Sequence, residues 1–273
     1  MNRLLEVKDL TVRYASSDFL AADSVTFGVS AGQVLGIVGE SGSGKTTVGL
    51  AVLGLLPATA TVTGSVLFEG TDLIGLKEDQ LRGLRGRQMS TIMQNATTAL
   101  DPYFTIGSQF TEILRRHKKL SRDEAREEAV RWLKAVGIQA THRELRSYPH
   151  EFSGGMNQRV VIAMNLALSP RLIVADEPTS ALDVTVQAEI LGLLRELRDE
   201  SKAGMVLITH DLGVVARLCS QVIVMKSGEV VEANSVTGLF ADPQHEYTRR
   251  LLGSLPGRPP ARPPDESVTG ARP

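Results

Sequence analysis

The sequence is poor in cysteine and in net charge, and its N-terminus has no apolar core of the signal-peptide kind. A single cysteine, Cys219, cannot form an intrachain disulfide, so a disulfide-stapled domain is excluded and a reducing compartment is expected. The net charge of −1, with 22% charged residues, argues against a generally basic surface for nucleic acid. The first ten residues, MNRLLEVKDL, predict no secretion signal.

One stretch, residues 46–68, has no charged residue and is long enough to raise the question of a membrane span. It is interrupted by Gly54, Pro57 and Gly64, and it directly follows a glycine-rich loop. We therefore expect a buried helix, a turn and a strand here, in a soluble chain.

The first quarter of the chain predicts strands. Residues 4–14 and 24–29 alternate apolar and polar side chains, as antiparallel strands do, and the apolar run 34–39 is typical of a strand covered on both faces. A helix is expected from Gly44 to about Leu55, and residues 63–73 predict a strand, a glycine turn and a short strand.

The rest of the chain predicts helices first and then an alternation. Residues 76–157 are expected to be helical, with a capping box of Ser121 and Glu124 opening a helix that Gly137 ends. From Gly154 a helix leads into the buried strand LIVADE, followed by a helix over 184–200 and strands MVLITH and QVIVMKSGEVVE. This order indicates an α/β core with a mainly parallel sheet, into which the helical stretch is inserted.

The segment GESGSGKTT predicts a phosphate-binding loop, because it fits G-x-x-x-x-G-K-[ST] between an apolar strand and an apolar helix. Glycines let backbone N–H groups face phosphates, and the helix adds its positive N-terminal end. Lys45 is expected to reach the β- and γ-phosphates and the Thr46 hydroxyl to ligate Mg²⁺. We expect a bound nucleoside triphosphate on Gly39, Glu40, Ser41, Gly42, Ser43, Gly44, Lys45, Thr46 and Thr47.

Two carboxylates, Asp176 and Glu177, end the apolar run of LIVADE. They are expected at the C-terminal edge of the sheet, where such sheets bind ligands. Asp176 suits Mg²⁺, through a water molecule, and Glu177 suits the polarisation of an attacking water. The alternative is an ordinary acidic turn before Pro178.

A second glycine turn, Ser153-Gly154-Gly155, offers N–H groups and a hydroxyl to an anion at a helix start. A helix N-cap without a ligand is the alternative. Together with the phosphate loop and the acidic strand, this turn resembles the signature of the ATP-binding-cassette (ABC) ATPases, over nearly all of residues 4–232. The resemblance implies that two cassettes pair head to tail, with each ATP between the phosphate loop of one and the signature of the other.

The resemblance also implies further site residues. Gln94 corresponds to the residue that senses Mg²⁺ and the attacking water and couples to the membrane partner. His210 corresponds to the histidine that contacts the γ-phosphate, and Asp183 to the aspartate that communicates across the dimer. Tyr14 stands where an aromatic ring stacks on adenine, with core packing as the alternative. The expected catalytic residues are thus Glu177, His210 and Gln94, and the expected metal ligands are Thr46, Gln94 and Asp176.

The expected fold is a P-loop NTPase core with an N-terminal antiparallel β subdomain and an inserted helical subdomain. The nucleotide-binding domain is expected over 1–235, with the insertion at about 83–157. A C-terminal element is expected over 236–256 and a disordered, proline-rich tail over 257–273, with a proline-motif ligand as the alternative for the tail.

Met156, where glutamine is commonest in the family, and the segment LFADPQHEYTRRLL are similar to ATPases of the oligopeptide, dipeptide and nickel importers. Asn157 stands where a basic residue is expected. The resemblance implies an ATPase peripheral to the cytoplasmic face of the plasma membrane. Its partners would be a second ATPase, two permease subunits and, indirectly, an extracytoplasmic substrate-binding protein, with no nucleic acid. A nickel or metal-chelate importer, a soluble non-transport ATPase and a catalytically dead subunit remain alternatives.

Overall fold

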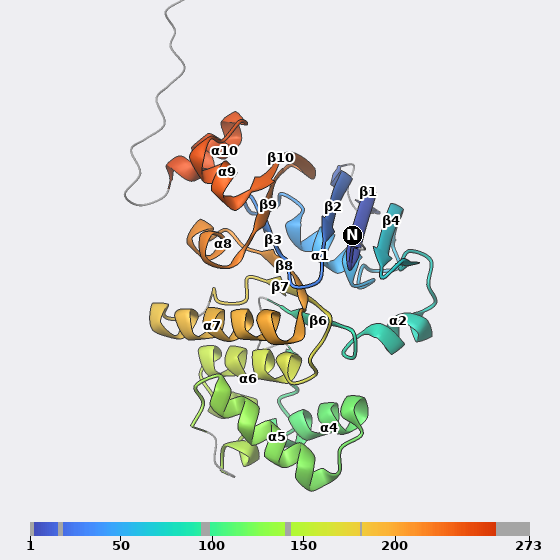
Figure 1. Cartoon of the computed structure of the whole chain (residues 1–273). Helices are drawn as coiled ribbons and strands as arrows, with labels where there is room; N and C mark the ends of the chain where they lie inside the picture. The colour runs from blue at the N-terminus through green and yellow to red at the C-terminus, as the bar shows by residue number, and fades with distance from the viewer. Residues whose placement is uncertain (1–2, 16–18, 94–98, 140–142, 181, 255–273) are drawn as a thin grey trace, which may run out of the picture.

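Two β-sheets form the framework of the chain in a computed structural model, which describes residues 3–15, 19–93, 99–139, 143–180 and 182–254 (Figure 1). The smaller sheet has the order β2-β1-β4-β5 and is antiparallel throughout. Its strands are β1 (Leu5–Tyr14), β2 (Leu20–Val29), β4 (Ala60–Phe68) and β5 (Thr71–Asp72). This confirms the expected antiparallel strands at 4–14 and 24–29.

The larger sheet has the order β10-β9-β3-β8-β7-β6. All its neighbours are parallel except the pair β9 and β10. Its strands are β3 (Val34–Val38), β6 (Met89–Ile92), β7 (Leu172–Asp176), β8 (Gly204–Ile208), β9 (Gln221–Lys226) and β10 (Glu229–Ser235). Every residue of β3, β7 and β8 is buried, as the continuous apolar runs predict for strands covered on both faces.

Helices cover both sheets. They are α1 (Lys45–Val52), α2 (Glu78–Leu84), α4 (Ile106–Lys118), α5 (Arg122–Ala135), α6 (Gly154–Leu166), α7 (Val184–Ser201), α8 (Leu212–Leu218), α9 (Val236–Ala241) and α10 (Glu246–Gly253), with single 3-10 turns η1 (Glu144–Arg146) and η2 (Pro149–Glu151). Helix α1 contacts strands of both sheets and shares one apolar cluster with them. Helices α4, α5 and α6 lie at the opposite end of the molecule from α9 and α10 (Figure 1).

Three sequence-based boundaries are wrong. The helix expected to reach Leu55 ends at Val52, and Gly54 with φ of 62° follows it. The segment 76–157 is not wholly helical, because it contains β6, the edge strand of the parallel sheet. The single strand expected over 221–232 is two strands, β9 and β10, since Ser227 and Gly228 both have positive φ and reverse the chain.

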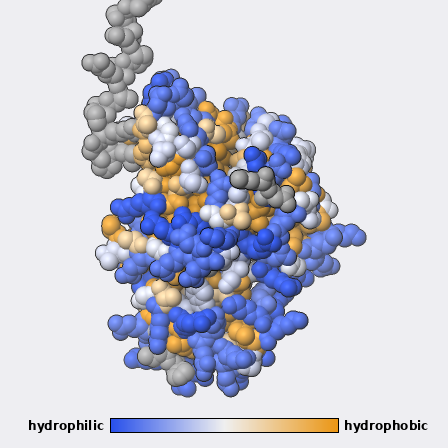
Figure 2. Space-filling model, in the orientation of Figure 1, coloured by the Kyte–Doolittle hydropathy of each residue, from blue (hydrophilic) through white to orange (hydrophobic). Residues whose placement is uncertain are grey.

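The charge-free stretch 46–68 folds as predicted, into the buried helix α1, a turn and β4. None of the helices in the described ranges has the length and apolar character needed to cross a bilayer. On the face drawn in Figure 2, hydrophobic residues are interspersed with hydrophilic ones.

Candidate functional site

The phosphate loop connects β3 to α1, and two of its glycines are required by close backbone approaches. A Cβ at Gly39 would lie 2.2 Å from the carbonyl oxygen of Met225, and one at Gly44 would lie 2.1 Å from that of Ala21. Both glycines have positive φ, and Gly44 is the N-cap of α1. The loop can therefore wrap tightly only with glycine at these positions.

Lys45 is the first residue of α1, and its ammonium lies inside the loop. Nζ donates hydrogen bonds to the carbonyl oxygens of Gly39 at 2.8 Å and Glu40 at 2.7 Å, and it lies 3.4 Å from Oγ of Ser43. Burial lowers the pKa of Lys45, although the nearby carboxylates, Glu177 first among them, oppose this effect. Of the other loop residues, Glu40, Ser41 and Gly42 are exposed.

Thr46 joins the loop to the acidic strand. Its hydroxyl donates a hydrogen bond of 2.7 Å to Oδ2 of Asp176, the last residue of β7. Asp176 is 6% exposed, and its burial raises the pKa of the carboxyl, with Glu177 adding to this and the Thr46 hydroxyl opposing it. Burial therefore deprives the ionised carboxylate of Asp176 of water, and a cation bound beside it would stabilise the charge instead.

Glu177 and His210 lie side by side because their strands are neighbours. Asp176 of β7 is in register with Ile208 of β8, so the residues that follow them meet at the same edge of the sheet. Oε1 of Glu177 accepts a 3.0 Å hydrogen bond from the backbone N–H of His210 and lies 2.6 Å from Nδ1 of its ring. Glu177 is 9% exposed and has φ of 48°, held by a backbone hydrogen bond to Ile208.

Tyr14, at the end of β1, reaches the same region. Its hydroxyl lies 3.2 Å from Oγ1 of Thr47, the third residue of α1. The ring is half-buried and does not belong to the fully buried core. Six predicted residues thus meet around the phosphate loop: Tyr14, Lys45, Thr46, Asp176, Glu177 and His210.

The signature turn and Asp183 have local roles within this chain. Ser153 caps α6 by accepting a hydrogen bond from the N–H of Met156, and a Cβ at Gly154 would meet no atom within 4 Å. Asp183 caps α7 by accepting hydrogen bonds from the N–H groups of residues 185 and 186. Within the described part of the chain, no hydrogen bond joins 153–155 to the phosphate loop. Gln94 lies outside the described residues.

Sequence reasoning missed two residues at this site. The side-chain amide of Gln158, on α6, donates to the carbonyl oxygen of Pro178, directly after Glu177. Tyr247, on α10, accepts a 2.9 Å hydrogen bond from the N–H of Glu40. The signal for Gln158 was its place in the signature helix. Tyr247 lies in the segment LFADPQHEYTRRLL, whose resemblance to the importer ATPases did not point to the phosphate loop.

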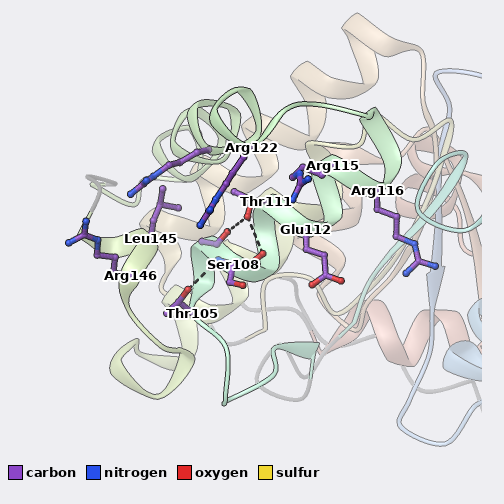
Figure 3. A pocket seen from close by; sticks show the side chains of 11 residues that line it. Thr105, Ser108, Thr111, Glu112, Arg115, Arg116, Arg122, Leu145 and Arg146 are labelled. Atoms are coloured by element: carbon purple, nitrogen blue, oxygen red, sulfur yellow. Dashed lines mark hydrogen bonds between the residues drawn. The ribbon is translucent and has the colours of Figure 1, made fainter.

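A second feature lies in the helical region, between α4, α5 and η1. It is an open pocket of about 930 Å³ (Figure 3). Five arginines line it, against a single acidic residue, Glu112: Arg115, Arg116, Arg122, Arg126 and Arg146. No guanidinium of these five forms an ion pair with a carboxylate among the described residues. Tyr103 and Phe104, immediately before α4, are 87% and 55% exposed.

Comparison with known proteins gives consistent matches. The family model described as ABC transporter matches residues 22–180. A probable peptide ABC transporter ATP-binding protein of Sinorhizobium fredii is 49% identical over 259 residues, covering 93% of this chain and 77% of that protein. The oligopeptide transport ATP-binding protein OppD of Salmonella typhimurium is 47% identical over 257 residues, with the same coverage of 93% and 77%.

The fold has a solved counterpart. An ATP-binding cassette, determined as a dimer in a post-hydrolysis state bound to ADP and Pi, matches with a TM-score of 0.77 and 29% identity. The match covers 85% of this chain and 98% of that one. The two chains therefore share one overall fold over the matched residues.

Proposed function

The chain belongs to the ABC transporter family, and from this premise we propose that it is the ATP-binding and ATP-hydrolysing subunit of an importer of di- and oligopeptides. The observation that carries the hydrolytic part is the meeting of Lys45, Thr46, Asp176, Glu177 and His210 at one sheet edge. The names of the similar proteins support peptides, rather than nickel or another metal chelate, as the cargo.

Mg²⁺ fits the residues present. The hydroxyl of Thr46 and the carboxylate of Asp176 are hard oxygen donors that already touch each other. No cluster of three or more His, Cys, Asp or Glu side chains suited to a metal occurs among the described residues. This agrees with Mg²⁺, which binds through one or two protein oxygens and the phosphates of its nucleotide. When bound, it would neutralise phosphate charge, and Gln94 is proposed as a further ligand.

In the proposed reaction, the oxygen of a water molecule attacks the γ-phosphorus, and the bond from that phosphorus to the oxygen bridging the β- and γ-phosphates breaks, so that ADP and phosphate leave. Lys45 would exchange its bonds to the Gly39 and Glu40 carbonyls for bonds to phosphate oxygens, losing no hydrogen bonds in the process. Glu177 would orient and deprotonate the attacking water, while His210 holds the carboxylate and contacts the γ-phosphate. Gln94 is proposed to sense the same water. Tyr14 would stack on adenine, and the N–H groups of residues 39–47 would bind the phosphates.

We further propose that two cassettes complete each other. Ser153, Gly154 and Gly155 would bind the ATP held by the phosphate loop of a second, identical or homologous, ATPase subunit. The absence of a hydrogen bond between signature and phosphate loop within the described chain supports this, as does the open space around Gly154. Asp183, at the N-terminus of α7 beside the 78%-exposed Val184, would lie at the same interface. We propose the domain division 1–235, with its insertion at 83–157, and 236–256.

The pocket between α4, α5 and η1 is proposed to be part of the face that meets the two permease subunits. Aromatic and arginine side chains are the residues that interfaces favour. The exposed Tyr103 and Phe104 directly precede Thr105, which lines the arginine-rich pocket. The subunit would then be peripheral, on the cytoplasmic face of the membrane. An extracytoplasmic substrate-binding protein would act on it only through the permeases, and no role with nucleic acid is proposed.

Peptide uptake in a strain lacking the gene tests this function. The wild-type gene should restore uptake of di- and oligopeptides, while the Lys45→Ala variant should not, because it cannot hold the phosphates. Purification of the tagged chain from membranes should bring down two permease subunits. Unchanged peptide uptake in the deletion strain would contradict the proposed cargo.

A further inference from the structure

The phosphate loop is contacted by the C-terminal part of the chain. The backbone N–H of Glu40 donates a 2.9 Å hydrogen bond to the hydroxyl of Tyr247, which is 207 residues away in the sequence. The carbonyl oxygen of the same Glu40 accepts the 2.7 Å hydrogen bond from Nζ of Lys45. Tyr247 therefore holds Glu40 through the backbone N–H of Glu40, and the carbonyl of the same residue holds Lys45.

Tyr247 is firmly held in this position. It is 7% exposed and belongs to an apolar cluster with Val38, the last residue of β3, and with Val224 of β9. The ammonium of Lys226 lies 5.3 Å from the centroid of its ring, within the range of a cation–π contact. The ring is therefore packed in the core beside β3 and β9, and from there its hydroxyl reaches the N–H of Glu40.

Helix α10, which carries Tyr247, is anchored by a buried carboxylate. Glu232 of β10 is 9% exposed, and its two oxygens accept hydrogen bonds of 2.9 Å from the backbone N–H groups of Gln244 and His245. Burial opposes ionisation of Glu232, but the Thr248 side chain, these two backbone hydrogen bonds and the nearby His245 outweigh it and hold the pKa of the carboxyl below its ordinary value. His245 in turn caps α10 by accepting the N–H of Tyr247.

We propose that Tyr247 is a positioning residue for nucleotide binding: its hydroxyl fixes the entry of the phosphate loop and thereby links the C-terminal element to the affinity for ATP. The inference rests on the proposed function, because it assumes that the loop binds ATP. It adds a contact from α10 to the loop that connects β3 to α1. In Figure 1, α10 lies beside α9 at the end of the molecule near β9 and β10.

The Tyr247→Phe variant tests the inference, because it removes the hydroxyl and keeps the buried ring. Without its acceptor, the Glu40 amide loses a hydrogen bond, and the loop should become less ordered before nucleotide arrives. The Kd and KM for ATP should rise about threefold to tenfold, while kcat changes by less than about twofold. The matched control is Tyr148→Phe, at a tyrosine that is 39% exposed, which should leave Kd and KM unchanged.

A second variant, Glu232→Gln, should act in the same direction, because it weakens the anchor of α10 without touching the loop. A purely structural role of Tyr247 would lower the melting temperature and leave the Kd for ATP unchanged well below that temperature. An unchanged Kd in Tyr247→Phe, or in Glu232→Gln if the first variant does not fold, would overturn the inference alone. Failure of the wild-type chain to bind ATP, or equal binding by Lys45→Ala, would overturn the proposed function as well.

Discussion

Oε1 of Glu177 lies 2.6 Å from Nδ1 of His210, and the backbone N–H of the same histidine donates to the same oxygen at 3.0 Å. Two adjacent parallel strands bring these residues together, since Asp176 and Ile208 are in register directly before them. The contact fixes the carboxylate at the edge of the sheet next to Lys45 and Thr46. A carboxylate held in this way is suited to orient one water molecule.

Glu177→Gln should retain ATP binding and lose turnover. The amide keeps the shape of the side chain but cannot accept a proton from water, so kcat for ATP hydrolysis should fall by about a hundredfold or more. Steady-state hydrolysis with the permeases present measures kcat, and Glu229→Gln, at an exposed position on β10, is the control. Normal hydrolysis by Glu177→Gln would exclude the role assigned to this carboxylate.

His210→Ala should lower kcat while the Kd for ATP changes little. The backbone N–H of residue 210 still donates to Glu177 in this variant, so the carboxylate keeps one of its contacts and loses the imidazole. We expect kcat to fall by about tenfold to a hundredfold, the range of one positioned hydrogen-bonding group. His150→Ala, at an exposed histidine, serves as the control. Equal kcat for His210→Ala and the wild type would argue for a structural histidine.

Asp176→Asn should stabilise the chain without nucleotide and abolish hydrolysis. Burial raises the pKa of Asp176, so the folded state binds its proton more tightly than the unfolded state does. The stability that this group contributes is therefore present below its unfolded pKa and is lost as pH rises through its folded pKa. At pH 7 the variant should melt about 2–4 °C higher for each kcal/mol that removal of the buried charge adds to the free energy of unfolding. A lower melting temperature at pH 7 would contradict the burial argument.

Cys219 should be almost unreactive in the native chain. Burial raises the pKa of its thiol to about 12, against an ordinary value of 9.0. Since the thiolate is the reactive form, alkylation at pH 8 should be about a thousandfold slower than in the urea-unfolded chain. Labelling with iodoacetamide followed by mass spectrometry measures both rates. Fast labelling of the folded chain would show that the cysteine is open to solvent.

The parts of the fold that depend on local pattern were predictable. The phosphate loop, the acidic end of β7 and the capping box of Ser121 and Glu124 each form from residues close together in the sequence. The antiparallel alternation of β1 and the fully buried β3 also follow from side-chain periodicity. These features predicted both sheets and four of the residues that meet around the loop, Lys45, Thr46, Asp176 and Glu177. The resemblance to the ABC ATPases added Tyr14 and His210.

What was missed depends on contacts that no local pattern records. Strand β6 has only four residues, and its flanks read as helix, so only pairing with β7 identifies it. The turn at Ser227 and Gly228 was overlooked because apolar residues continue on both sides of it. The hydrogen bond between Tyr247 and Glu40 depends on how α10 packs on β9, and a separation of 207 residues gives no sequence signal for it.

Hydrolysis is proposed to take place between two cassettes, with the phosphate loop of one and the signature of the other on the same ATP. The most direct test is the mass of the Glu177→Gln chain in solution with ATP and Mg²⁺, measured by sedimentation alone and with any cassette that co-purifies from membranes. A stable two-cassette species should form with ATP and separate when ADP replaces ATP. It should fail to form when Gly154→Asp places a charge in the signature. Two results together would contradict hydrolysis between two cassettes. The Glu177→Gln chain would remain a single cassette with ATP, and the wild type, at the same protein concentration, would hydrolyse ATP while it too remains a single cassette.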